Sequence, residues 1–202
     1  MFLILPKMHP VLEEYRKLPM FFLAGPILGG GDWHMPMSEL LMKRLESLIM
    51  VNPSRYDSSH PHYGYHEHLE TETKYAGRQM PEIHFERQTD WERYYLDQAA
   101  DKWQTGCVIF WLAEQKEQRP DGMPYAMDTR GEIGEWRGRM MYDRNLRVVM
   151  GAEKNFPGLS QIKRNFELAL PDFRIYDTME EVVERATFFA YPSMSFGERV
   201  QA

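Results

Sequence analysis

The clearest candidate for chemistry is a glutamate in the segment MDTRGEIGEW, residues 127 to 136. Glu132 lies there between Gly131 and Gly134, in a stretch that we expect to be helical. Glycine inside a helix costs about 1 kcal/mol relative to alanine, so we expect something to pack against this face. A carboxylate near a helix start suits a nucleophile or a partner for sugar hydroxyls. Thr129 and Glu132 also fit a capping box, in which Glu132 would only stabilise the helix start.

Further carboxylates lie near the start of a second expected helix, which begins near residue 88. Asp90 and Glu92 lie off its expected buried stripe, where the helix dipole favours negative charge and a carboxylate could face a pocket. Asp97 is spaced to pair with Arg93 one turn earlier. A solvated surface position is the alternative for each of these acids. The apolar stripe itself is expected to consist of Trp91, Tyr95, Ala99 and Trp103.

A strand that runs into a glycine-rich turn is the next candidate, in FFLAGPILGGGDWH, residues 21 to 34. Gly25 would let the backbone approach a ligand, and Gly29, Gly30 and Gly31 would offer backbone amides to anionic or hydroxyl groups. The spacing matches neither GxGxxG nor the GK[ST] ending of a P-loop, so hydrolysis of nucleoside triphosphates has no support. A glycine loop without a ligand is the alternative.

A histidine cluster and one cysteine complete the candidates. The cluster HPHYGYHEH holds His60, His62, His66 and His68, whose imidazoles could bind zinc, but no cysteine or metalloprotease pattern accompanies them. We therefore expect no metal, and interpret the cluster as part of a polar lid or a subunit interface. Cys107 lies inside an apolar strand and is expected to be an inert core residue.

Five apolar, β-prone runs are expected to form the sheet that positions these residues. They do not alternate with polar residues, which is typical of parallel strands covered on both faces. Helical patterns fill most gaps, with Thr178 as an expected N-cap. We predict an α/β fold, a three-layer sandwich around a doubly wound, mainly parallel five-stranded sheet of the flavodoxin-like kind. The expected strands cover residues 20–24, 48–51, 106–112, 146–151 and 173–176, and the expected helices include 36–48, 158–170 and 178–190.

The chain is expected to form one domain over residues 1–202. It would carry an N-terminal extension at 1–19 and a long His/Tyr-rich insertion at 52–87, which has no sustained apolar period and suits a lid. A second polar loop, at 114–128, follows the strand GCVIFWL at the edge where open α/β sheets bind ligands.

Composition narrows the class of partner. The 202 residues carry 24 lysines and arginines against 30 acids, a formal charge of −6, so a nucleic-acid or anionic membrane surface is disfavoured and a small-molecule ligand fits better. No run of 18 apolar residues occurs, so we expect no membrane span. A single cysteine excludes an internal disulfide and favours a reducing compartment, the cytoplasm.

An ordered set of motifs resembles the nucleoside 2-deoxyribosyltransferase-like family, which includes nucleoside and nucleotide N-glycoside hydrolases. The set is FLAGPI with its glycine stretch and Trp33, then VNPSRY, then the Trp91–Glu92 helix with a strand ending FWL, then TRGEIGEW. The resemblance covers residues 20 to 155 in order. It implies that Glu132 is the nucleophile that attacks the anomeric carbon and that Glu92 assists near the leaving base. The substrate-binding residues that we expect are Gly25, Pro26, Gly29, Gly30, Trp33, Asn52, Arg55, Tyr56, Asp128 and Arg130.

The resemblance implies cleavage of the N-glycosidic bond of nucleosides or their 5′-monophosphates through a glycosyl-glutamate intermediate, with transfer of a 2-deoxyribosyl group to another base. Hydrolysis is an alternative, as are a non-catalytic nucleotide-binding module and a metal-dependent enzyme built on the histidine cluster. No cofactor is expected, and relatives suggest a homo-oligomer. Ribose or deoxyribose, nucleoside or monophosphate, and the identity of the base stay open.

Overall fold

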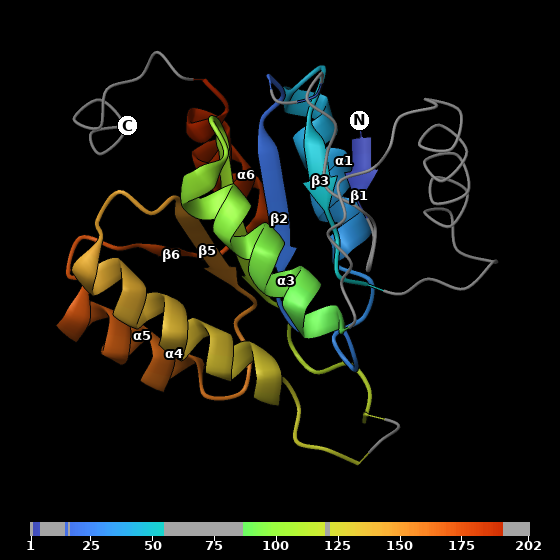
Figure 1. The fold of residues 1–202 in the computed structure, drawn as a ribbon. Helices are drawn as coiled ribbons and strands as arrows, with labels where there is room; N and C mark the ends of the chain where they lie inside the picture. The colour runs from blue at the N-terminus through green and yellow to red at the C-terminus, as the bar shows by residue number, and fades with distance from the viewer. Residues whose placement is uncertain (1, 5–14, 16, 55–86, 120–121, 192–202) are drawn as a thin grey trace.

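The computed structural model describes residues 2–4, 15, 17–54, 87–119 and 122–191. These residues form an α/β fold built on one sheet (Figure 1). The sheet has six strands, and every neighbouring pair is parallel. The strands are β1 (Phe2–Ile4), β2 (Met20–Ala24), β3 (Ile49–Val51), β4 (Gly106–Leu112), β5 (Val148–Ala152) and β6 (Ile175–Tyr176).

The order of the strands is β1-β3-β2-β4-β5-β6. Five of them coincide with the five predicted apolar runs, two without any shift and three with ends that shift by one or two residues. The sixth, β1, pairs with β3 at the sheet edge and comes from the segment expected to be an extension. The order reverses between β2 and β4, so the loops that follow these two strands diverge and leave a crevice, where ligands bind in open α/β sheets.

The strands β2 to β5 are buried along their whole length, which explains why their sequences do not alternate. Phe22 and Phe110 belong to one apolar cluster of the core, whereas Phe21 and Ile109 belong to another. Successive side chains of a strand point to opposite faces, so the sheet separates the two clusters.

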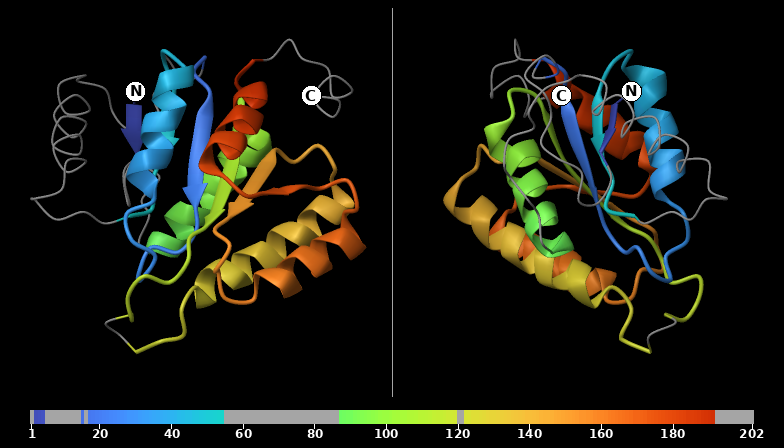
Figure 2. Two further views of the ribbon diagram at one scale, coloured as in Figure 1. Left: turned by 180° about the vertical axis from the view of Figure 1, so that it is seen from behind. Right: turned by 45° about the vertical axis from the view of Figure 1, so that its right-hand side comes forward.

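Helices complete both clusters. Side chains of α3 (Gln88–Asp97), α4 (Met127–Tyr142) and α5 (Leu159–Ala169) pack in the first cluster, and those of α1 (His34–Arg44) and α6 (Met179–Thr187) pack in the second. In Figure 1 α3 lies in front of the sheet, whereas α1 and α6 lie in front of it in the rear view of Figure 2. The predicted apolar stripe is confirmed, with Trp91 and Tyr95 of α3 buried together with Ala99 and Trp103, which follow the end of α3.

The start of α6 confirms the predicted N-cap. Thr178 is the N-cap of α6, where its hydroxyl accepts a hydrogen bond from the Glu181 amide at 3.2 Å. A short 3-10 turn, η3 (Phe188–Ala190), follows this helix.

Within the residues that the structure describes, no helix is both long and apolar enough to cross a bilayer.

Arg147 holds the junction between α3 and β4. A π-helical turn, η2 (Gln98–Lys102), ends α3, and turns of this kind leave carbonyl groups without helical partners. The Arg147 guanidinium donates to four backbone carbonyls there, those of Ala99, Ala100, Trp103 and Gln104. This one side chain therefore fixes where α3 stops and where β4 begins.

We expect Arg147→Met to lower the free energy of unfolding by about 2–3 kcal/mol, because several half-buried carbonyls lose a charged donor together. Urea denaturation followed by circular dichroism measures the change. The matched control is Arg144→Met, an exposed arginine three residues earlier. Equal stability of the two variants would show that the carbonyls of the π-helical turn do not depend on Arg147.

Candidate active site

A cavity of about 1030 Å³ lies at the carboxyl end of β2, between α3 and α4. Apolar side chains from the loop after β2 line one part of it, and charged side chains from the two helices line the rest. Five carboxylates and three guanidiniums contribute among the described residues. The charged residues are Glu92, Arg93, Asp97, Arg119, Asp128, Glu132, Glu135 and Arg139, and the others include Gly25, Pro26, Ile27, Leu28, Pro53, Leu96, Met127 and Trp136.

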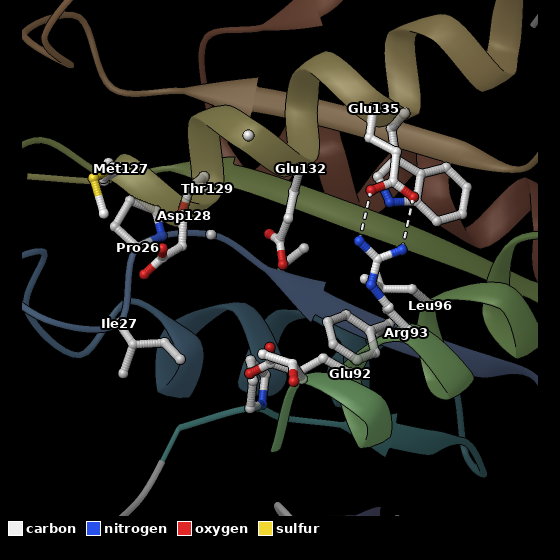
Figure 3. Close-up of a pocket in the computed structure, with 18 of the residues that line it drawn as sticks. Pro26, Ile27, Glu92, Arg93, Leu96, Met127, Asp128, Thr129, Glu132 and Glu135 are labelled. Atoms are coloured by element: carbon white, nitrogen blue, oxygen red, sulfur yellow. Dashed lines mark hydrogen bonds and ion pairs between the residues drawn. The ribbon is translucent and has the colours of Figure 1, made fainter. Parts of the chain in front are cut away.

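Glu132 reaches this cavity from the second turn of α4. The helix begins at Met127, after Ala126 in the left-handed conformation with φ 54°. Thr129 is therefore inside the helix and buried, not at its N-cap, and the capping-box interpretation is wrong. Figure 3 shows the Glu132 carboxyl pointing from α4 into the cavity, with Glu92 on the opposite wall. Helix capping thus gives no reason for a glutamate at this position.

The surroundings of Glu132 disfavour its negative charge. Its pKa is raised from the ordinary value of 4.5 to about 7, and burial is the largest cause. The negative charges of Glu92, Asp128 and Glu135 also contribute to this rise, and the positive charge of Arg93 opposes it. A carboxyl group with a pKa near 7 exchanges its proton in the physiological range, which is typical of groups that act in catalysis.

Glu92 is held by its own helix. The side-chain amide of Gln88, one turn earlier, donates to Glu92 Oε1 at 2.7 Å and to the carbonyl of Pro53 at 3.2 Å. Pro53 follows β3, so Gln88 connects the start of α3 to the end of that strand. Asp90, the neighbouring candidate, is exposed and does not line the cavity.

Two ion pairs join α3 to α4 along the cavity. The Arg93 guanidinium donates to both carboxylate oxygens of Glu135, at 3.3 and 3.2 Å (Figure 3). One turn further along both helices, Arg139 pairs with Asp97 at 2.6 Å and lies over the Trp136 ring, 4.0 Å from its centre. The prediction that Asp97 pairs with Arg93 is therefore wrong, because each finds a partner on the other helix.

Gly25 and Pro26, two of the expected substrate-binding residues, line the cavity. Gly25 has a φ of 155°, and a Cβ there would collide with the Trp111 carbonyl oxygen, so this position admits no side chain. Trp33 is buried, with its indole N–H donating to the Pro26 carbonyl at 2.8 Å. It supports the loop from behind and is not part of the lining.

Gly29 and Gly30 pack against the loop after β4 and do not line the cavity. The Gly29 carbonyl accepts hydrogen bonds from the amides of Lys116 and Glu117, at 2.8 and 3.2 Å. A Cβ at Gly29 would lie 2.8 Å from the Glu117 carbonyl oxygen, and one at Gly30 would lie 2.8 Å from the Tyr125 hydroxyl. These glycines therefore allow two loops to approach each other.

The remaining predicted binding residues differ in where they lie. Asp128 lines the cavity and is 80% exposed, with Arg119 at 4.0 Å, whereas Arg130 donates to the Pro157 carbonyl at 2.7 Å and does not line it. Asn52 is buried and accepts from the Ser54 amide at 2.9 Å, which shapes the turn after β3. Arg55, Tyr56 and the histidine cluster at 60–68 lie outside the described residues.

The remaining candidates from the sequence are a metal site and Cys107. Among the described residues no group of histidine, cysteine and acidic side chains is arranged to hold a metal ion. Cys107 is fully buried, and burial raises the pKa of its thiol, which fits the inert core residue that was predicted.

Several lining residues were missed by sequence reasoning. Glu135, Trp136 and Arg139 follow Glu132 at spacings of three, four and seven, so they share its face of the helix. That periodicity was the available signal, once Glu132 was suspected. Arg119, whose side chain is only 12% exposed, had no such signal because it lies in a loop.

Comparison with known proteins adds no family. No protein-family model matches this chain, and a search of curated proteins finds no significant relative.

The glycines beside Glu132 provide a test of the α4 surface. A Cβ at Gly131 or Gly134 would meet no described atom within 4 Å, so the expected packing partner is not found among the described residues. We expect Gly131→Ala and Gly134→Ala each to raise the free energy of unfolding by about 0.5–1 kcal/mol, the helix preference of alanine. Thermal and urea unfolding measure it. A loss of stability in either variant would reveal a contact at this face.

Proposed function

We propose that this protein cleaves the N-glycosidic bond of nucleosides or their 5′-monophosphates through a covalent glycosyl-Glu132 intermediate, and transfers the 2-deoxyribosyl group to a second base. The observation that carries the proposal is the position of Glu132, which points into a large cavity with Glu92 on the opposite wall. The motif resemblance supports the same two residues. Hydrolysis, with water in place of the second base, is the alternative outcome of the same intermediate.

The strand order supports a finer description of the fold within this proposal. Without the edge strand β1, the order β3-β2-β4-β5-β6 corresponds to the 2-1-3-4-5 order of flavodoxin-like sheets. We therefore propose a single doubly wound, three-layer domain, with residues 52–87 as an insertion. A cytoplasmic location and a homo-oligomeric state belong to the same proposal.

In the proposed reaction the Glu132 carboxylate attacks the anomeric carbon of the sugar. The C–O bond to Glu132 forms as the C–N bond breaks, and the electron pair of that bond leaves with the base nitrogen. A proton reaches the departing base from Glu92 or from water. In the second step a nitrogen of another base attacks the anomeric carbon, loses its proton and releases the Glu132 carboxylate.

The two carboxyl groups suit different parts of this reaction. With a pKa of about 7, Glu132 is available as the nucleophilic carboxylate at neutral and alkaline pH, and at lower pH it is protonated. Glu92 is oriented by Gln88, which fixes its direction relative to the cavity. Neither step requires electron transfer, so the proposal includes no redox cofactor.

We expect Glu132→Gln to lower base exchange and hydrolysis by about 10³-fold or more, because the amide oxygen is a far weaker nucleophile than a carboxylate. The assay incubates a panel of nucleosides and 5′-monophosphates, with and without a second free base, and separates the products by chromatography. Wild-type protein should also form an adduct with a 2-fluoro nucleoside analogue on a peptide that contains Glu132, detected by mass spectrometry.

The control for this experiment is Asp90→Asn, which changes an exposed carboxylate two residues before Glu92. It should retain wild-type activity and the adduct. Full activity of Glu132→Gln, or an adduct on Glu92, would overturn the assignment of the nucleophile. A wild-type protein that binds nucleosides without converting any of them would instead favour the non-catalytic binding module.

The raised pKa of Glu132 also predicts how stability depends on pH. At pH 4 and below the group is mainly protonated in both the folded and the unfolded chain, so it has little effect on the free energy of unfolding. Between its unfolded value near 4.5 and its folded value near 7, only the folded protein keeps the proton, so raising the pH disfavours folding. We therefore expect Glu132→Gln to be more stable than wild type by about 2 kcal/mol at pH 8 and equal to it at pH 4. Urea unfolding at both pH values tests this, and a variant that is less stable at pH 8 would contradict it.

A further inference from the structure

The ion pair between Arg93 and Glu135 spans the two helices beside Glu132. Its two hydrogen bonds, at 3.3 and 3.2 Å, join two guanidinium nitrogens to the two oxygens of one carboxylate, a bidentate contact of the kind that arginine often makes with carboxylates. The side chains are 69% and 40% exposed, so the pair contributes little to stability by itself. Its position is more informative than its strength, because both partners line the cavity into which Glu132 points (Figure 3).

A second ion pair between the same two helices, with one hydrogen bond in place of two, provides the comparison. Arg139 and Asp97 also join α4 to α3 and also line the cavity, four residues further along each helix. Both pairs join the same two helices, with the arginine on α3 in the first pair and on α4 in the second. They differ in their position relative to Glu132, because Glu135 follows it by three residues on α4, whereas Arg139 follows it by seven. The charges of Arg93 and Glu135 also shift the pKa of Glu132.

The charges that face Glu132 come from both walls of the cavity. On α3 they are Glu92 and Arg93, and on its own helix they are Asp128 and Glu135. Arg119, from the loop after β4, lies against Asp128 at 4.0 Å, and the cavity residues from the loop after β2 carry no charge. Arg93 is thus the guanidinium that lowers the pKa of Glu132, and Glu135 both opposes it and keeps it in place.

From this arrangement we propose that Arg93 and Glu135 are a positioning pair that sets the charge state of Glu132, with Arg93 favouring the carboxylate and Glu135 favouring the carboxylic acid. This proposal rests on the proposed function, in which Glu132 must be ionised to attack. Neither residue needs to touch the reacting atoms. Their effect on the reaction is to fix the pH above which the nucleophile is available.

The test compares single substitutions in the two ion pairs. We expect Arg93→Gln to raise the midpoint of the acid limb of kcat/KM by about half a pH unit, because it removes a positive charge and leaves Glu135 unneutralised. Glu135→Gln should lower that midpoint by a similar amount, because it removes a negative charge and leaves Arg93 unneutralised. The double variant should return close to wild type. Arg139→Gln and Asp97→Asn, the matched controls, should change at most the height of the profile.

A second readout does not depend on activity. The pH titration of Glu132 in protein with ¹³C-labelled glutamate carboxyl groups, assigned by the resonance that is missing in Glu132→Gln, should show the same opposite shifts. They should shrink in 0.5 M salt, because the pair is exposed.

The outcomes separate this proposal from the proposed function. Opposite shifts in the resonance without any catalytic activity would support the positioning pair and contradict the enzyme. Activity together with midpoints that do not move, that move in the same direction for both substitutions, or that move equally in the Arg139 and Asp97 variants would overturn the positioning pair alone.

Discussion

Glu132 carries its carboxyl group into a cavity where burial and three other carboxylates all oppose a negative charge. Such an arrangement is unfavourable by itself, so the rest of the fold must hold it in place. The strands β2 to β5 are fully buried, and α3 and α4 pack over one face of the sheet through large side chains such as Trp91 and Trp136. The two ion pairs between these helices add direction to that packing. The position of Glu132 is thus supported by apolar burial elsewhere in the fold.

The topology explains why these residues meet. Because the strand order reverses between β2 and β4, the loop after β2 turns toward one side and leaves a crevice. Gly25 keeps this loop close to β4, since any side chain there would collide with the Trp111 carbonyl. Arg147 fixes the other end of the site by ending α3 at the π-helical turn. Residues far apart in the chain are therefore brought to one cavity by the backbone path of the loop after β2 and by an arginine that does not line the cavity itself.

The features that follow from burial were predicted correctly from the sequence. Predictions from a local pattern were wrong where a residue far away in the chain provides another partner. The five apolar runs became strands because burial on both faces leaves a continuous signal. β1 is only three residues long and lies at the edge, so its signal was too short. The capping box was wrong because the left-handed Ala126 starts the helix earlier than Thr129.

The site shows the same division. Glu132, Glu92, Gly25, Pro26 and Asp128, which the sequence indicated as site residues, all line the one cavity, and their role there stays a prediction. The expected pairing of Asp97 with Arg93 failed because arginine and glutamate on α4 compete for both, and nothing in the spacing along α3 reveals them. Gly29 and Gly30 were misplaced for a similar reason, since their partners, Glu117 and Tyr125, belong to a loop almost a hundred residues away.

Charge in the cavity also bears on how the proposed reaction would be accelerated. Among the described residues five carboxylates and three guanidiniums line the cavity, so acidic groups outnumber basic ones there, and Glu132, with a pKa of about 7, is partly protonated at neutral pH. As an N-glycosidic bond breaks, positive charge develops on the sugar ring. In the transition state each carboxylate of the cavity would be attracted to the positive charge on the sugar ring. Only interactions that strengthen in the transition state increase the rate. The neighbouring carboxylates that raise the pKa of Glu132 would therefore also contribute to catalysis, because they stabilise the positive charge on the sugar.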